Sequence, residues 1–184
     1  MALALGGVSL AQTANISSGQ FGAGPRVRIT QAVDNTKLVT LHGSVNPHAR
    51  AQFDQGAMPG SQAMNRITLL LQRSPQQETT LEQLMAQQLD KSSPNYHKWL
   101  TPAEFGAQFG PADADIQAIK DWLTAQGFTN IRVSAGKTVV QFDGNVGLVQ
   151  GAFHTPIHGY FVNGKNHFAN VDDPQIPAAL SPVV

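Results

Sequence analysis

The order of apolar and polar positions separates a polar first third of the chain from a remainder with regular hydrophobic periods. Residues 12–64 are rich in Gln, Ser, Asn, Gly and Ala, and only residues 37–41 (KLVTL) resemble a strand. Residues 47–65 show no hydrophobic period and are interrupted by Gly and Pro, which is typical of an irregular connector. We therefore expect an irregular leader over 12–64 with one short strand, and regular structure from Arg66 onward.

The first regular elements after this leader are a strand and a helix. Residues 66–73 (RITLLLQR) form an apolar run between charges, with the length of a central buried strand. Thr79 and Glu82 have the spacing of a capping box, which predicts a helix over 79–90. The apolar stripe of this helix would consist of Leu81, Leu84, Met85 and Leu89.

Two further helices have recognisable ends. Thr101 and Glu104 form a second capping box, which predicts a short helix to about Phe109. The next helix should have Asp113 as its N-cap and Gly127 as the left-handed residue after its last turn. Its buried face would carry Ile116, Ile119 and Leu123.

Hairpin signals dominate the remaining sequence. Residues 131–134 and 138–143 are β-prone runs separated by a short turn, so they should form antiparallel neighbours. Asn145 should cap one more helix. Residues 156–162 and 166–169 should form a second hairpin around an Asn-Gly turn.

In chain order these elements give β-α-β-β-α-β with two helices inserted after the first helix, which is the split βαβ, or ferredoxin-like, order. The expected fold class is α+β, with an antiparallel sheet, helices on one face and an inserted helical pair. The other face would be open, and a partner protein is a natural cover for it. Residues 171–184 contain several Pro and no periodic apolar face, so they predict an extended Pro-rich linker.

Composition and charge narrow the classes of partner. Lys and Arg together number 12, as do Asp and Glu, so the formal net charge is zero. No electrostatic attraction therefore favours nucleic acid or an anionic membrane. The chain has no Cys, which excludes disulfides and thiolate sites. We predict a monomer without a nucleic-acid or membrane partner.

The first residues bear on localisation. Residues 1–11 (MALALGGVSLA) are uncharged and end in the small-x-small pattern that signal peptidase accepts. They are too few to span a bilayer. We interpret them as the remnant of a signal peptide, which predicts a secreted or periplasmic protein. The alternative is a disordered leader with an accidental apolar bias.

Candidate chemistry is sparse. His154 and His158 are four residues apart, but Pro156 lies between them and prevents a regular helix with both on one face. We therefore expect partly exposed structural histidines, no metal ligands and no cofactor in this chain. No G-x-S-x-G nucleophile motif is present, and no catalytic residue is predicted.

One stretch of the sequence carries a family signature. Residues 93–105 (SPNYHKWLTPAEF), followed by FGP at 109–111, resemble the S-P-x-Y-H-K-[YW]-L-T-P-x-x-F…F-G-P signature of the sedolisin, or kumamolisin-like, activation domain. Similarity to the family in order and spacing continues over residues 115–128, 152–160 and 168–180. The resemblance therefore covers about two thirds of the chain.

The resemblance implies a division of the chain and a function. Residues 65–170 would be the activation domain, and residues 171–184 a linker toward a catalytic domain. In the family, that domain is subtilisin-like and carries a Ser-Glu-Asp triad and a calcium site. This chain has neither the E-x-x-x-D pair nor the Gly-Thr-Ser segment of that machinery, so we expect it not to be an enzyme. Calcium is expected only in the catalytic domain.

The implied function is that of a propeptide of a secreted serine-carboxyl endopeptidase. It would act as intramolecular chaperone and inhibitor of its cognate sedolisin-like catalytic domain, and acid-triggered proteolysis would remove it. The parent precursor would have serine-type peptidase activity. The alternative is a free-standing ferredoxin-like module that binds or inhibits a protease in trans.

Two segments are candidates for contact with the protease. Tyr96, His97 and Trp99 precede the second capping box, and they either dock on the protease or anchor the inserted helices to the core. The Pro-rich end would lie in the cleft as an extended strand, as a substrate does. Its candidate contacts are Pro174, Gln175, Ile176 and Pro177. His154 and His158 are candidates for a pH switch, because histidine changes charge between neutral and acidic pH.

Overall fold

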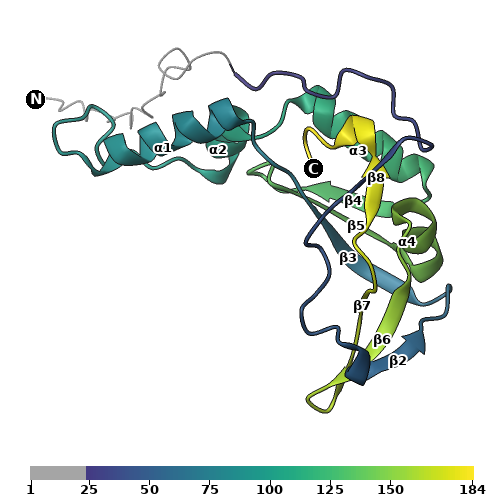
Figure 1. Cartoon of the computed structure of the whole chain (residues 1–184). Coiled ribbons are helices and arrows are strands. Elements are labelled where there is room, and N and C mark those ends of the chain that lie inside the picture. The colour runs from purple at the N-terminus through teal and green to yellow at the C-terminus, as the bar shows by residue number, and fades with distance from the viewer. Residues whose placement is uncertain (1–23) are drawn as a thin grey trace, which may run out of the picture.

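The computed structural model describes residues 24–184, which form an L-shaped molecule (Figure 1). One limb is a helical arm made by α1 and α2, and the other limb, the body, contains the strands with α3 and α4. The helices are α1 Pro75–Leu89, α2 Pro102–Phe109, α3 Asp113–Ala125 and α4 Val146–Phe153. The predicted signal-peptide remnant, residues 1–11, lies outside the described residues.

The strands form three small antiparallel sheets, with the orders β3-β5-β4, β2-β6-β7 and β1-β8. The first sheet contains β3 Ala63–Leu70, β4 Thr129–Val133 and β5 Val139–Asn145. The second contains β2 Asp54–Ala57, β6 Ile157–Val162 and β7 Lys165–Asn170. The third pairs β1 Leu38–Thr40 with β8 Gln175–Pro177. The 3-10 turns are η1 Ala51–Phe53 and η2 Ala178–Leu180.

The α+β class predicted from the sequence is confirmed, whereas the ferredoxin-like arrangement is not. β3, β5 and β4 pair antiparallel as expected for the first three strands of that order. The fourth strand, β6, pairs with β2 and β7 in a separate sheet. The reason is that β2, which lies in the supposed irregular connector, offers β6 a partner.

The leader contains more regular structure than its sequence predicts. The strand expected over 37–41 is confirmed as β1. Residues 47–65, expected to be irregular, contain η1, β2 and the start of β3. β2 has no apolar alternation and is held by its pairing with β6, a long-range contact that periodicity cannot reveal.

Helix α1 begins one turn earlier than expected. Its N-cap is Ser74, whose hydroxyl accepts the Gln77 N–H while the Gln77 side chain accepts the Ser74 N–H. The predicted box at Thr79 is wrong, because the Thr79 hydroxyl instead donates to the Pro75 carbonyl within the helix. The predicted stripe is also only partly buried, since Leu84 is buried but Leu89 is 72% exposed.

The other helix ends agree better with the sequence. The Thr101 capping box and the Asn145 cap are confirmed. Gly127 has φ +89°, as a left-handed residue after α3 requires. Asp113 is not the N-cap of α3, however: Ala112 has that position, and the Asp113 carboxylate pairs with Lys137 at 2.6 Å.

The core lies in the body, between the first sheet and the two helices α3 and α4. The predicted face of α3 is confirmed, since Ile116, Ile119 and Leu123 are all buried. An aromatic cluster continues this core from the helices to the sheet, and consists of Trp122, Phe128, Phe142 and Phe153. β5, not β3, is the central strand, so the expectation for residues 66–73 is wrong in this respect.

The C-terminal residues are part of the body. The expectation of an extended linker over 171–184 differs from the structure, in which Ile176, Leu180 and Val183 are each 0% exposed. β8 is extended, as its prolines favour, but it pairs with β1 and is followed by η2. The change from strand to 3-10 turn spaces the buried side chains irregularly, so no apolar period appears in the sequence.

Candidate protein-interaction site

The base of the helical arm is fixed to the body. The Gln77 side chain donates to the Gly110 carbonyl at 2.9 Å, which joins α1 to the end of α2. A side chain at Gly106 would clash with the carbonyl oxygen of Ala135, in the turn between β4 and β5. Glycine is therefore required where α2 crosses this turn, and the close approach sets the direction of the arm.

The far end of the arm is a loop folded back on the last turn of α1. Gln88 is buried, its side chain donates to the Lys98 carbonyl, and its own carbonyl accepts the His97 N–H at 3.1 Å. The Asn95 side chain donates to the Gln87 side chain at 2.7 Å and is also buried. Two adjacent glutamines therefore give the loop a defined shape.

This loop brings three of the predicted contact residues together as an aromatic stack. The rings of Tyr96 and His97 are 3.8 Å apart and those of His97 and Trp99 are 5.9 Å apart, with interplanar angles of 20° and 24°. His97 has φ +55°, a left-handed conformation that is uncommon for a residue with a side chain. We call this loop, residues 90–101, with the exposed end of α1, the arm tip.

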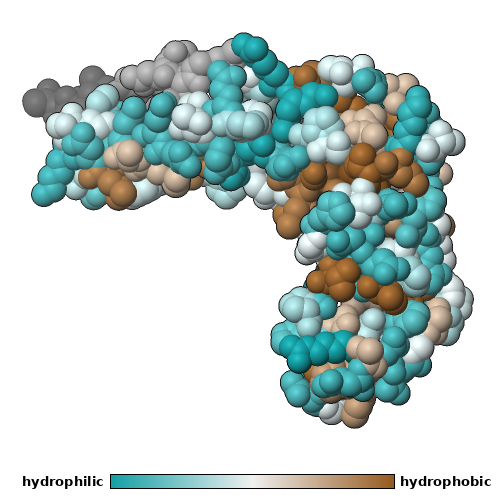
Figure 2. All heavy atoms as spheres, viewed as in Figure 1, coloured by the Kyte–Doolittle hydropathy of each residue, from teal (hydrophilic) through white to brown (hydrophobic). Residues whose placement is uncertain are grey.

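The arm tip exposes apolar surface. Trp99 is 63% exposed and Leu89 is 72% exposed. Trp99 therefore does not anchor the inserted helices to the core, which was the structural alternative for it. Figure 1 shows that the arm carries this surface away from the body, and Figure 2 shows apolar side chains again at the inner corner of the L.

The predicted contacts at the C-terminal end are divided. Pro174 and Gln175 are half-buried, whereas Ile176 and Pro177 are buried in the core. As the domain is folded here, the last two cannot touch a partner. Their burial follows from the β1-β8 pairing, in which Ile176 faces Val39 across the two strands.

The two histidines of the predicted pH switch are in different environments. His154 is exposed in the left-handed C-cap of α4. The His158 Nδ1 is 2.8 Å from the Asp54 carboxylate, a contact that joins β6 to β2. Hydrogen bonds from the Gly56 N–H and then from His158 hold the pKa of Asp54 below its usual value. Only His158 therefore has a carboxylate partner here.

A second exposed apolar surface was not predicted. Phe161 and Phe168, which are 48% and 47% exposed, lie on the same face of the β6-β7 hairpin as the buried Ile157. Alternation along the hairpin gives this face, since directly opposed residues of two strands share a face. The alternation that places Phe161 and Phe168 on one face is therefore present in the sequence. Whether that face is exposed or buried cannot be predicted from the alternation.

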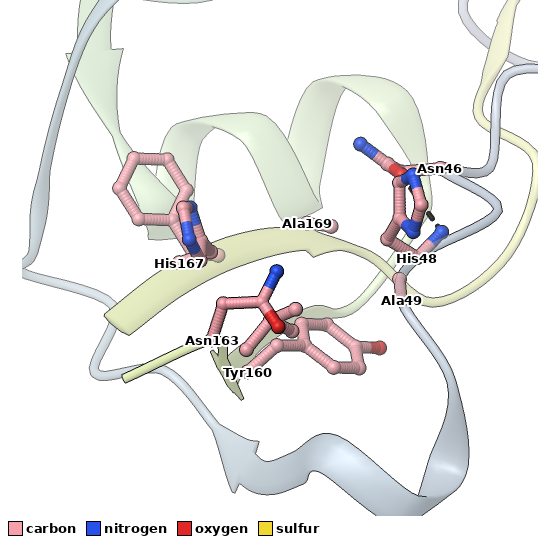
Figure 3. A pocket seen from close by; sticks show the side chains of 9 residues that line it. Asn46, His48, Ala49, Tyr160, Asn163, His167 and Ala169 are labelled. Carbon is pink, nitrogen blue, oxygen red and sulfur yellow. Dashed lines mark hydrogen bonds between the residues drawn. The ribbon is translucent and has the colours of Figure 1, made fainter. Parts of the chain in front are cut away.

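Two hollows lie in the body, and neither is lined by Asp, Glu, Lys or Arg. A cavity of about 310 Å³ lies beside the β6-β7 hairpin and is lined by Tyr160 and His167 of the hairpin and by Asn46 and His48 of the leader (Figure 3). A groove of about 790 Å³ between residues 39–44, β3 and α4 is lined mainly by apolar residues.

Neither a metal centre nor a membrane span is found in the described part of the chain. Among residues 24–184, no three His, Cys, Asp or Glu side chains are grouped so that they could hold a metal ion. None of the helices in the same range combines the length and the apolar character needed to cross a bilayer.

Comparison with known proteins supplies the family context. The sequence model of the family described as "Pro-kumamolisin, activation domain" matches residues 50–184. The chain is 29% identical over 164 residues to sedolisin of Pseudomonas sp. (strain 101), covering 89% of this chain and 27% of the relative. It is 27% identical over 151 residues to xanthomonalisin of Xanthomonas sp. (strain T-22), covering 82% and 18%. The chain therefore spans about a quarter or less of these curated relatives.

Proposed function

Since the chain belongs to the pro-kumamolisin activation-domain family, we propose that it is the propeptide of a sedolisin-type peptidase. It binds the catalytic domain of its own precursor, assists the folding of that domain and keeps it inactive. The precursor is an exported serine-type endopeptidase, and acid-triggered proteolysis removes the propeptide. The chain itself performs no catalysis.

The observation that carries this proposal is the arm tip. Tyr and Trp are enriched among the residues that dominate binding free energy at protein interfaces. At the arm tip, stacking and the Gln87 and Gln88 contacts fix the loop before any partner arrives. A preformed contact surface loses less conformational entropy on binding, so the same buried area gives a higher affinity.

The L shape supports the same function. The arm and the body present two surfaces at an angle, with apolar side chains at the corner between them (Figure 2). A globular partner seated against this corner would touch the arm tip and the body at once. We propose that the catalytic domain has this position, with Tyr96, His97 and Trp99 among its contacts and Pro174 and Gln175 at the edge of its interface.

Inhibition in trans tests the proposal. The full chain should inhibit a sedolisin-type peptidase in a peptide-cleavage assay, and Trp99→Ala should raise the inhibition constant by at least roughly 30-fold. The matched control is Val27→Ala, which truncates an exposed apolar side chain of the leader that is not part of the arm tip. The proposal fails if the folded chain does not inhibit. Equal inhibition by wild type and Trp99→Ala would remove the arm tip from the interface.

A free-standing inhibitor acting in trans remains the second candidate, because residues 24–184 contain a complete core of their own. Antibodies against the arm tip distinguish the two in the source organism. A large precursor that is converted to a fragment of about this mass supports the propeptide, whereas a fragment made without any precursor supports the free-standing inhibitor.

A further inference from the structure

Residues 24–45, which we call the N-terminal strap, are bound to the body although they precede the family match, which begins at residue 50. The strap passes over α3 and then runs beside β8 (Figure 1). Its apolar side chains pack against the core while remaining partly exposed: Ile29, Val33, Val39 and Leu41. Such shallow packing gives limited stability, so polar contacts decide whether the strap stays docked.

The first polar contact is the carboxylate of Asp115, on α3. Asp115 is 0% exposed, and its oxygens accept the N–H groups of Arg28 and Ile29 at 2.8–3.1 Å. The Arg28 guanidinium donates to the carbonyls of Gln72 and Pro182, both at 2.6 Å. Burial lowers the pKa of Arg28, and the charge of Asp115 acts in the opposite direction.

The second contact is the carboxylate of Asp173. It accepts three consecutive strap N–H groups, those of Gly43, Ser44 and Val45, at 2.9–3.3 Å. Burial raises the pKa of Asp173, but these hydrogen bonds and the nearby His42 outweigh it and leave the pKa below its usual value. The His42 Nδ1 is 3.5 Å from the carboxylate.

The strap is hydrogen-bonded to the C-terminal segment, which we define as residues 173–184. β1 of the strap is the strand partner of β8 in the described structure. At the two ends of this pair, the Leu41 N–H donates to the Pro174 carbonyl at 2.8 Å and the Ala178 N–H donates to the Lys37 carbonyl at 2.7 Å. Undocking the strap would therefore free Ile176 from its strand partner and loosen the segment.

We propose that the N-terminal strap is an acid-releasable latch on the C-terminal segment, pinned by the carboxylates of Asp115 and Asp173. Protonation of Asp173 removes the negative charge that the N–H groups of Gly43, Ser44 and Val45 bind, so the strap undocks and residues 173–184 become accessible to a partner or a protease. The charged and titratable groups facing the two pins are Arg28 and His42, both on the strap. That this exposure serves release of the inhibitor rests on the proposed function, whereas the latch itself does not.

The direction of the pH effect follows from the hydrogen bonds that the carboxylate accepts when the strap is docked. A carboxylate that accepts N–H bonds in the docked state favours its ionised form there, as the lowered pKa of Asp173 reflects. For Asp173, docking is thus strongest above the pKa of the undocked carboxylate and weakens as the pH falls through the lowered docked pKa. In that window the docking constant should fall about tenfold per pH unit for each proton taken up.

Trp122 reports on the strap, because its indole N–H donates to the Asn35 side chain at 2.9 Å. The chain contains 2 Trp residues, so the Trp99→Phe variant leaves Trp122 as the single tryptophan, which can be excited selectively. Acrylamide quenching of this full-length variant should rise between about pH 7 and about pH 2.5, which spans the ordinary aspartate pKa. Hydrogen exchange should show residues 28–45 and 173–184 losing protection together while β5 stays protected.

Substitutions identify the pins. Asp115→Asn and Asp173→Asn should both raise quenching at neutral pH, and Asp173→Asn should also flatten its acid dependence. Asp121→Asn on α3 and Asp172→Asn beside the second pin should change neither. If circular dichroism shows that Asp115→Asn prevents folding, the test of the latch rests on Asp173→Asn alone. The latch is refuted if strap amides stay protected in acid or lose protection only when β5 does. No peptidase is present, so the result is independent of the inhibition assay.

Discussion

The arm tip and the C-terminal segment both contain candidate contacts with the protease, and the two differ in exposure. The arm tip exposes Trp99 and stacks it in line with its neighbours, whereas the C-terminal segment hides Ile176 and Pro177. The arm is shaped by contacts between residues close in sequence, such as Gln88 with His97. The C-terminal segment is held by the strap, from the other end of the chain. Under the proposed function, the arm can therefore bind its partner as it stands, whereas the segment would first have to be released.

The largest effect should come from the core of the body, against which the arm can be compared. Phe142→Ala removes a side chain that is 1% exposed and stacks with Phe153, so it should lower the free energy of unfolding by about 3–5 kcal/mol. Leu89→Ala truncates an exposed apolar residue of the arm and should change the free energy of unfolding by less than about 0.5 kcal/mol. Urea denaturation of both variants measures the difference. Comparable losses would mean that the arm tip is packed rather than presented.

The join between arm and body should give the next largest effect. Gly106→Ala forces a methyl group against the Ala135 carbonyl and should destabilise the chain by about 1–3 kcal/mol. The control is Gly151→Ala in α4, where the new side chain meets open space and should stabilise by about 0.4–1 kcal/mol. Thermal melts would record shifts of opposite sign. A neutral Gly106→Ala would show that the arm is not held at this crossing.

Much of this structure was predictable where the signals are local. The Thr101 and Asn145 caps and both hairpins follow from the sequence, because each depends on residues within one or two turns. The stack at the arm tip was named as a contact site but its geometry was not, since it depends on the folded-back loop. The start of α1 was also signalled locally, by Ser74 with Gln77 as a capping box, but the later pair Thr79 and Glu82 has the same spacing and was preferred.

What could not be predicted depends on contacts between distant segments. β2 has no period of its own and exists because β6 pairs with it. The burial of Ile176 depends on the strap, and the role of Asp115 depends on N–H groups far earlier in the chain. Neither periodicity nor motif spacing contains this information.

A smaller effect should come from the local signal that starts the arm. Ser74→Ala removes the oxygen that accepts the Gln77 N–H and should cost about 1 kcal/mol. Thr80→Ala, in the same helix, removes a hydroxyl that donates only to the carbonyl of Gln76, one turn earlier. Stability should therefore not fall. Urea unfolding followed by the helical circular dichroism signal compares the stabilities of the two variants. Equal losses would indicate that the cap does not control the arm.

The smallest effect should be the pH dependence of the β2-β6 pair. Because hydrogen bonds lower the folded pKa of Asp54, its contribution is present above the unfolded pKa and disappears as the pH falls through the folded value. Asp54→Asn should therefore lower the urea midpoint at neutral pH and match the wild type in acid. A difference that persists at about pH 2.5, below the ordinary aspartate pKa, would contradict this assignment.

The most direct test of the central claim, that the arm tip is the preformed contact, uses the two tryptophans as separate probes. The chain labelled with 5-fluorotryptophan gives one fluorine resonance from Trp99, which is 63% exposed, and one from Trp122, which is 4% exposed. On addition of an unlabelled sedolisin-type peptidase that the chain inhibits, the Trp99 resonance should shift and lose its solvent isotope effect, while that of Trp122 stays in place. A complex in which the Trp99 resonance is unchanged would contradict the account.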